Sequence, residues 1–74
     1  MILIFESAKG DDCVVATVTT QEQAMREIRD FCEKRDFEIR YFRAWKRESV
    51  KYFDVGSWYE RFRLELEDGE IWQD

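Results

Sequence analysis

The spacing of the apolar residues changes twice along this chain, and these changes limit the fold more than any other feature. Between positions 20 and 35 apolar residues recur on one face of a helix, whereas the flanking segments form short apolar runs or alternate with polar residues. The helical positions are Ala24, Met25, Ile28, Phe31 and Cys32. We therefore expect one domain over residues 1–74 with an α+β fold, in which an antiparallel sheet of four to five strands carries one helix on one face, in the order β-β-α-β-β-β.

The first half of the chain predicts a hairpin followed by the helix. Residues 2–6 and 13–19 have the composition of strands, and the polar stretch between them is typical of a turn. We expect the helix to begin with a capping box, in which Thr19 is the N-cap and Glu22 stands three positions later. The outer face of this helix mixes acidic and basic side chains, as solvated helices commonly do.

The second half predicts further strands. Residues 37–46 alternate with a period of two, which indicates a third strand after the helix. A turn at 47–49 leads into a fourth strand at 50–55, and Gly56-Ser57 ends it.

The last segment fits two structures. The side chains from 62 to 66 alternate between apolar and charged, as a half-buried strand requires, but residues 57–60 would also form a helix capping box. We favour a strand over 58–66, because the alternation is strict and Asp68-Gly69 supplies the turn that brings 70–72 back.

Aromatic residues make up 16% of the chain, more than one face of a small sheet can bury. In the favoured register Trp58 points into the core and Tyr59 points away from it. Exposed apolar surface commonly marks a partner-binding site, and the edge strands of so small a domain also predict a homodimer. We assign partner binding to the outward and C-terminal residues Tyr59, Arg61, Arg63, Glu65, Glu67, Asp68 and Glu70.

Charge is distributed unevenly. Residues 34–51 contain seven basic and three acidic side chains, a local charge of +4 in a chain of net charge −5. Arginines alternate there with aromatic residues, a composition that suits single-stranded nucleic acid or nucleotide phosphates. The candidate anion-binding residues are Arg40, Arg43, Lys46 and Arg47. The alternative is cross-strand pairing with Glu60, Glu65 and Glu67, which we favour because dedicated nucleic-acid binders are usually basic.

The acidic residues of the C-terminal region suggest a different function, in which the chain imitates a nucleic acid instead of binding one. A row of carboxylates there would occupy a basic groove on another protein by imitating nucleic-acid phosphates. Solvation alone also explains an acidic surface. The carboxylates of this row are Asp54, Glu60, Glu65, Glu67, Asp68, Glu70 and Asp74.

Several features argue against an enzyme. The chain has no histidine, which removes the commonest general base and the usual zinc ligand, and no phosphate loop or metal motif is present. We therefore expect no catalytic residue, metal or cofactor.

We expect Cys13 and Cys32 to be reduced and buried in the core. The apolar start of the chain is too short for a signal peptide and no segment is long enough to span a membrane, which predicts a cytoplasmic protein.

The run Asp54-Val55-Gly56-Ser57-Trp58, between a Trp-containing strand and an aromatic-rich last strand, resembles a motif near the C-terminus of small uncharacterised phage and mobile-element proteins. Those proteins have an aromatic residue where this chain has Val55. The group includes anti-CRISPR and other anti-defence proteins. The resemblance implies a stoichiometric inhibitor that binds a host nuclease complex without catalysis.

Overall fold

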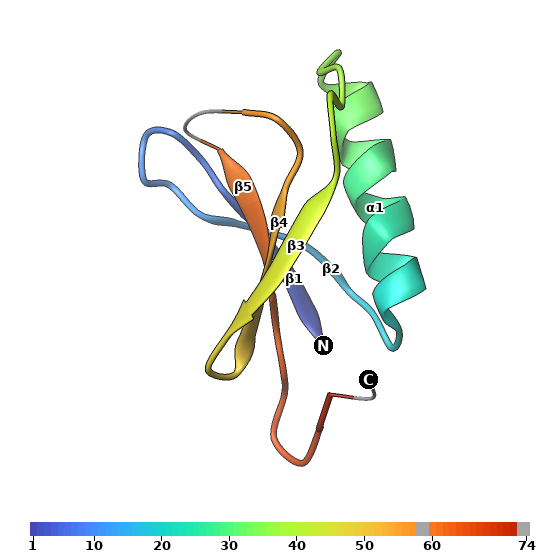
Figure 1. Ribbon diagram of the computed structural model, residues 1–74, viewed down its shortest axis with the longest axis vertical. Helices are drawn as coiled ribbons and strands as arrows, with labels where there is room; N and C mark the ends of the chain where they lie inside the picture. The colour runs from blue at the N-terminus through green and yellow to red at the C-terminus, as the bar shows by residue number, and fades with distance from the viewer. Residues whose placement is uncertain (58–59, 73–74) are drawn as a thin grey trace.

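In the part of the chain that the structure describes, five antiparallel strands form one sheet with a single helix on one face, as the periodicity predicts (Figure 1). The computed structural model describes residues 1–57 and 60–72, so the predicted positions of Trp58 and Tyr59 lie outside the described residues. The elements in chain order are β1 (Ile2–Glu6), β2 (Cys13–Thr17), α1 (Gln21–Lys34), β3 (Arg43–Arg47), β4 (Val50–Asp54) and β5 (Arg61–Glu65).

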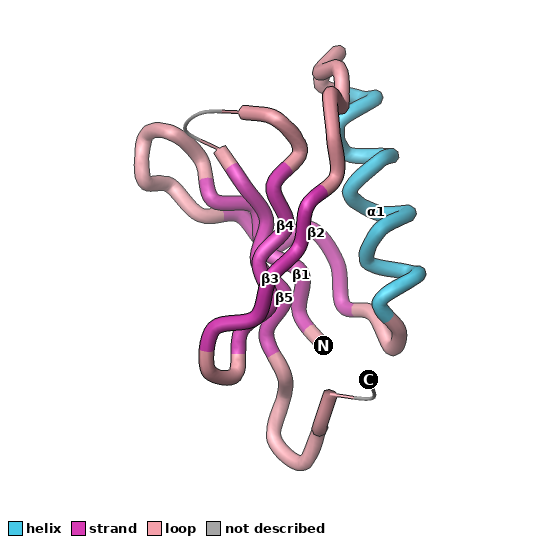
Figure 2. The backbone as a smooth tube through the Cα atoms, in the orientation of Figure 1, coloured by secondary structure: helices cyan, strands magenta, loops and turns pink. Residues whose placement is uncertain are grey.

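The last strand joins the two halves of the sheet. The spatial order is β2-β1-β5-β4-β3, so β5 lies between β1 and β4 and pairs with both. In Figure 2 the strands (magenta) form one layer beside the helix (cyan). The strand interpretation of the ambiguous C-terminal segment is therefore confirmed over Arg61–Glu65. The apolar residues of this alternation point into the core, because Phe62 and Leu64 are buried and lie opposite Phe5 and Leu3.

The core lies between α1 and the face of the sheet that the helix covers. Strand positions at alternate residues point into it, and Phe53 on β4 lies directly opposite Phe62 on β5. The ring of Phe5 is 5.2 Å from that of Phe62 and 4.9 Å from that of Phe31 on the helix. Ala24, Ile28 and Cys32, one turn apart, are the buried residues of α1.

The helix begins one residue later than predicted. Thr20, not Thr19, is the N-cap, and its side-chain oxygen accepts a hydrogen bond from the backbone N–H of Gln23 at 3.1 Å. The carboxamide oxygen of Gln23 in turn accepts bonds from the backbone N–H and hydroxyl of Thr19. Two adjacent threonines each satisfy the capping pattern, and glutamine at the third position serves as well as the predicted Glu22, which explains the one-residue error.

The predicted strand at 37–46 is too long, since β3 begins only at Arg43. The reason lies at the end of α1, where Asp36 adopts a positive φ of 56°. The N–H of Phe37 bonds the carbonyl of Cys32 and the N–H of Asp36 bonds that of Glu33, which is the Schellman arrangement. Phe37 therefore packs against the core from a connection rather than from a strand.

Two further expectations fail at the sheet's periphery. Cys13 is exposed, because β2 is an edge strand whose pairing with β1 shifts between Leu3 and Ile4; Cys32 is buried as expected, and both thiols are free. Residues 70–72 do follow a turn, closed by the bond from the Glu70 N–H to the Glu67 carbonyl, but they form no strand. Half-buried Trp72 packs against the core instead.

Candidate functional site

Within residues 1–57 and 60–72, no helix lies over the second face of the sheet (Figure 1), and we call it the open face. Its side chains alternate along each strand with those that enter the core, so the register identifies them. The open face comprises Ile2, Ile4 and Glu6 of β1, Arg61, Arg63 and Glu65 of β5, Val50, Tyr52 and Asp54 of β4, and Arg43, Trp45 and Arg47 of β3.

Aromatic rings and guanidinium groups stack along this face. Trp45 and Tyr52 lie directly opposite each other on β3 and β4, with ring centroids 5.6 Å apart and planes inclined by 20°. The guanidinium of Arg61 lies 4.7 Å from the Tyr52 ring, and that of Arg43 lies 5.9 Å from Tyr41 and 6.0 Å from Trp45. Trp45 remains 36% exposed. The stack therefore orders an aromatic surface without burying it.

Ion pairs cover the other half of the open face. The guanidinium of Arg63 lies 2.6 Å from Glu6, 2.8 Å from Asp12 and 2.7 Å from Glu65. Arg61 pairs with Glu6 at 2.7 Å, so Glu6 bridges two arginines of the neighbouring strand. This network links β1 to β5, which are far apart in sequence.

The network fixes the charge state of its members. Burial raises the pKa of Glu6, but hydrogen bonds from Arg61 and Arg63 outweigh it, so the pKa lies below the usual 4.5. Burial opposes the charge of Arg63, yet its hydrogen bonds to three carboxylates raise its pKa. Both shifts favour the charged forms of Glu6 and Arg63, whose opposite charges lie side by side on the face.

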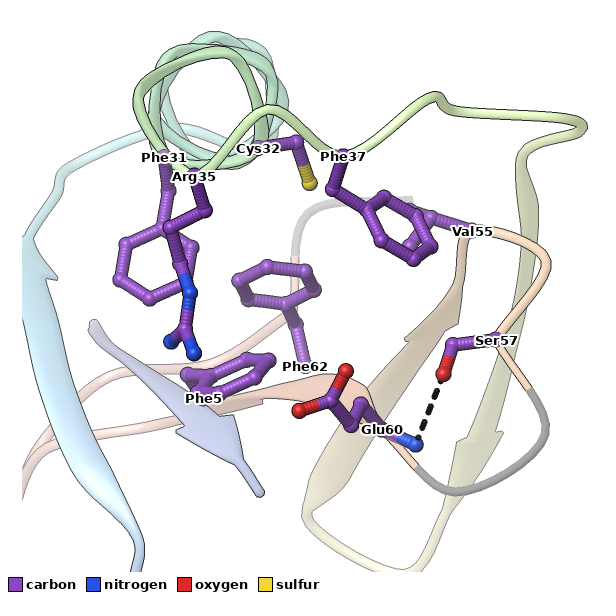
Figure 3. A pocket seen from close by; sticks show the side chains of 9 residues that line it. All are labelled: Phe5, Phe31, Cys32, Arg35, Phe37, Val55, Ser57, Glu60 and Phe62. Carbon is purple, nitrogen blue, oxygen red and sulfur yellow. Dashed lines mark hydrogen bonds between the residues drawn. The ribbon is translucent and has the colours of Figure 1, made fainter. Parts of the chain in front are cut away.

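Asp54 holds the end of β4 in place. One carboxylate oxygen accepts from the Gly56 N–H at 2.9 Å, and the other accepts from Arg43 at 3.3 Å and from the Tyr41 hydroxyl at 3.2 Å. Gly56 has a φ of 102°, and a Cβ there would lie 2.9 Å from the Cβ of Arg40. The Ser57 hydroxyl accepts from the Glu60 N–H at 3.2 Å (Figure 3). The described part of this motif, residues 54–57, thus shapes the turn after β4.

The predicted partner-binding residues divide between two places. Arg61, Arg63 and Glu65 share the open face, as the alternation requires. Glu67 and Asp68 are exposed in the turn after β5, whereas Glu70 forms an ion pair with the amino group of Met1 at 2.9 Å. Tyr59, like Asp74 of the acidic row, lies outside the described residues. Three other carboxylates of that row, Asp54, Glu65 and Glu70, are each paired with a cation.

The four candidate anion-binding residues also separate. Arg43 and Arg47 lie on the open face, but Lys46 points to the other face, 6.0 Å from the Trp72 ring. Arg40 packs its side chain beside Gly56 in the connection before β3.

The expected acidic partners of this basic segment were wrong. β3 pairs with β4 rather than with β5, so the carboxylate opposite Arg43 is Asp54. Glu65 pairs with Arg63 of its own strand.

Sequence reasoning missed the centre of the site, the Trp45–Tyr52 stack. The predicted turn at 47–49 contained the signal for it, because in a hairpin closed by a two-residue loop at 48–49 these residues lie opposite each other. Glu6 and Asp12 gave no such signal, since their pairing with Arg63 depends on β1 lying next to β5.

An apolar cavity of about 30 Å³ lies on the covered side, between the end of α1 and β5 (Figure 3). Such a volume holds about one water molecule, which is too little for a substrate. The Cys32 thiol faces it, and burial raises the pKa of this thiol, so it is a poor nucleophile. The cavity is lined by Phe5, Phe31, Cys32, Arg35, Phe37, Val55, Ser57, Glu60 and Phe62.

Within the described ranges, 1–57 and 60–72, no group of three or more histidine, cysteine, aspartate or glutamate side chains is arranged to hold a metal ion. The helix seen in these ranges is neither long nor apolar enough to cross a bilayer. Compared with known protein families, curated proteins and solved structures, the chain matches none of them.

Proposed function

We propose that this chain is a non-enzymatic protein-binding module and that the open face is its contact surface. The observation that carries the proposal is the stack of Trp45, Tyr52 and Arg61 on a sheet face that no helix covers. Tryptophan, tyrosine and arginine are the residues most enriched at interface hot spots. Their mutual stacking also reduces the side-chain entropy that binding would otherwise cost.

The charges of the open face favour a protein over a nucleic acid. Three arginines of this face, Arg43, Arg61 and Arg63, form ion pairs with the carboxylates Glu6, Asp12, Asp54 and Glu65. A polyanion would have to displace these carboxylates, whereas a protein surface of mixed charge would not.

The resemblance of residues 54–58 to phage and mobile-element proteins supplies the class of partner. We propose a stoichiometric inhibitor, anti-CRISPR-like in its action, that acts in the bacterial cytoplasm on a nucleic-acid-targeting defence complex. Binding to an exposed surface suits such a role, because it requires no catalytic group and no cofactor.

Affinity capture tests the proposal. The wild-type chain, a Trp45→Ala variant and an Arg26→Ala control on the outer face of α1 are each used to retain proteins from a bacterial lysate, which mass spectrometry then identifies. We expect the same bacterial protein or complex with wild type and control, and its loss with Trp45→Ala. Retention by all three chains, or by none, would contradict the proposal.

A single-stranded nucleic-acid binder is the second candidate. Trp45 lies between Arg43 and Arg47 on the open face, a local arrangement that stacks bases and contacts phosphates in such proteins. A gel-shift titration with single-stranded oligonucleotides at low salt separates the two functions. Binding that weakens as salt rises and disappears with Trp45→Ala supports this second candidate.

A further inference from the structure

The two edges of the sheet are not equivalent. β2 and β3 are the outer strands, but the pairing of β2 with β1 is interrupted between Leu3 and Ile4, whereas β3 pairs with β4 without interruption over all five residues. A bulge bends an edge away from a further strand, and a regular edge offers a continuous template. β3 is therefore the edge better suited to accept another strand.

The hairpin geometry shows which backbone groups face outward. The loop between β3 and β4 has two residues, and Arg47 opposite Val50 closes it. Such a closing pair is hydrogen-bonded, and bonded pairs alternate along an antiparallel ladder. Odd positions of β3 therefore bond to β4, and Ala44 directs its N–H and carbonyl to the outer edge. Ala44 is exposed, and within residues 1–57 and 60–72 no strand lies beyond β3.

The side chains beside this edge define a pattern. Arg43, Trp45 and Arg47 share the open face, with the two arginines about 13 Å apart along the strand. A strand added beside β3 would place every second side chain next to these three. The complementary sequence is an acidic residue, any residue, an apolar residue, any residue and a second acidic residue.

A second copy of this chain fits this edge poorly in the register centred on Trp45. Antiparallel pairing of two β3 strands about Trp45 would place Arg43 of one copy opposite Arg47 of the other, and like charges in that position are destabilising.

The net charge of −5 repels an acidic partner at long range. At contact distance, however, the local charge of +4 over residues 34–51 dominates, because charges beyond about 10 Å are screened at 0.1 M salt.

We propose that β3 is a strand-addition site for an extended acidic segment of the partner protein. The segment pairs with the backbone of Ala44, sets an apolar side chain against Trp45 and brings one carboxylate to Arg47. Its other carboxylate shares the guanidinium of Arg43 with Asp54, which bonds only one of the guanidinium nitrogens, so the carboxylates of the open face stay in place. This inference rests on the proposed function, since it supplies the chemistry of the partner that the open face binds.

A peptide titration followed by NMR tests the inference on the intact chain. The probe is a capped heptapeptide, Thr-Glu-Thr-Val-Thr-Glu-Thr, and two matched peptides carry lysine in place of glutamate or N-methyl groups along one backbone edge. We expect the probe to shift the amide signals of β3 and to slow hydrogen exchange at Ala44. The lysine and N-methylated peptides should bind at least tenfold more weakly, because they lack the charge and the hydrogen bonds respectively.

Two variants complete the test. Ala44→Pro removes an outward N–H at an edge position where proline is tolerated, and it should abolish binding of the probe. Arg47→Gln leaves the backbone unchanged, and it should weaken both the binding of the probe and the salt dependence of that binding. This variant tests the inference even if Ala44→Pro fails to fold. Equal binding of all three peptides, no binding, or shifts confined to other strands would overturn the inference. If the probe peptide does not bind but capture of the partner still requires Trp45, only the strand-addition inference is contradicted. If capture of the partner does not depend on Trp45, the proposed function itself is contradicted.

Discussion

The two faces of the sheet use neighbouring residues of the same strands for different purposes. On β4, Phe53 points under α1 and is 2% exposed, whereas Tyr52 beside it stacks on Trp45 at the surface. On β5, Phe62 enters the core and Arg63 joins the ion pairs of the open face. In the part of the chain that the structure describes, one helix covers one face, which forms the core, and we propose that the open face serves for contact.

The largest difference between the faces should appear on truncation of a core phenylalanine. Phe62→Ala removes a ring that packs on Phe5 and Phe31, and we expect a loss of about 3–5 kcal/mol in the free energy of unfolding. The total free energy of unfolding of a domain this small is little larger than that loss. Circular dichroism should therefore show that the variant is largely unfolded. The neighbouring Arg61→Ala is the control. A stable Phe62→Ala protein would show that the covered face is not the core.

The two thiols give a second contrast between covered and uncovered positions. Cys13 is exposed on β2, whereas Cys32 is buried beneath α1 with a raised pKa. A thiol reagent at neutral pH should therefore label Cys13 rapidly and Cys32 at least tenfold more slowly, because Cys32 must wait for local opening. Mass spectrometry of the labelled chain measures both rates. Equal rates would mean that α1 does not protect the core.

The ion pairs of the open face should contribute less. Glu6→Gln removes a carboxylate that bridges Arg61 and Arg63 at a partly exposed site, and we expect a loss of about 1 kcal/mol at neutral pH. Because folding lowers the pKa of Glu6, its contribution is present above the usual value near 4.5 and is lost as the pH falls through the lower folded value.

Urea unfolding of both chains at several pH values measures this. The difference in unfolding free energy between wild type and Glu6→Gln should shrink below pH 4.5. A difference that grows on acidification would contradict the assigned network.

Local patterns predicted most of the elements, and long-range pairing decided the rest. The alternation of residues 61–65 was enough to orient β5, and the helical spacing was enough to place α1. Asp36 gave no signal for the end of the helix, because glycine is the usual residue at that left-handed position. The ion pairs of Glu6 with β5 cross more than fifty positions of sequence, and no local pattern reports such a contact.

The separation of stability from contact is tested most directly by two measurements on Trp45→Ala. Trp45 is a third exposed and rests mainly on Tyr52, so its loss should lower the free energy of unfolding by about 1 kcal/mol, a shift of roughly 4–8 °C in Tm. The same variant should reduce retention of the captured partner at least tenfold, as truncation of a hot-spot tryptophan does. An unfolded Trp45→Ala chain, or a folded one that retains the partner as well as wild type, would contradict the account.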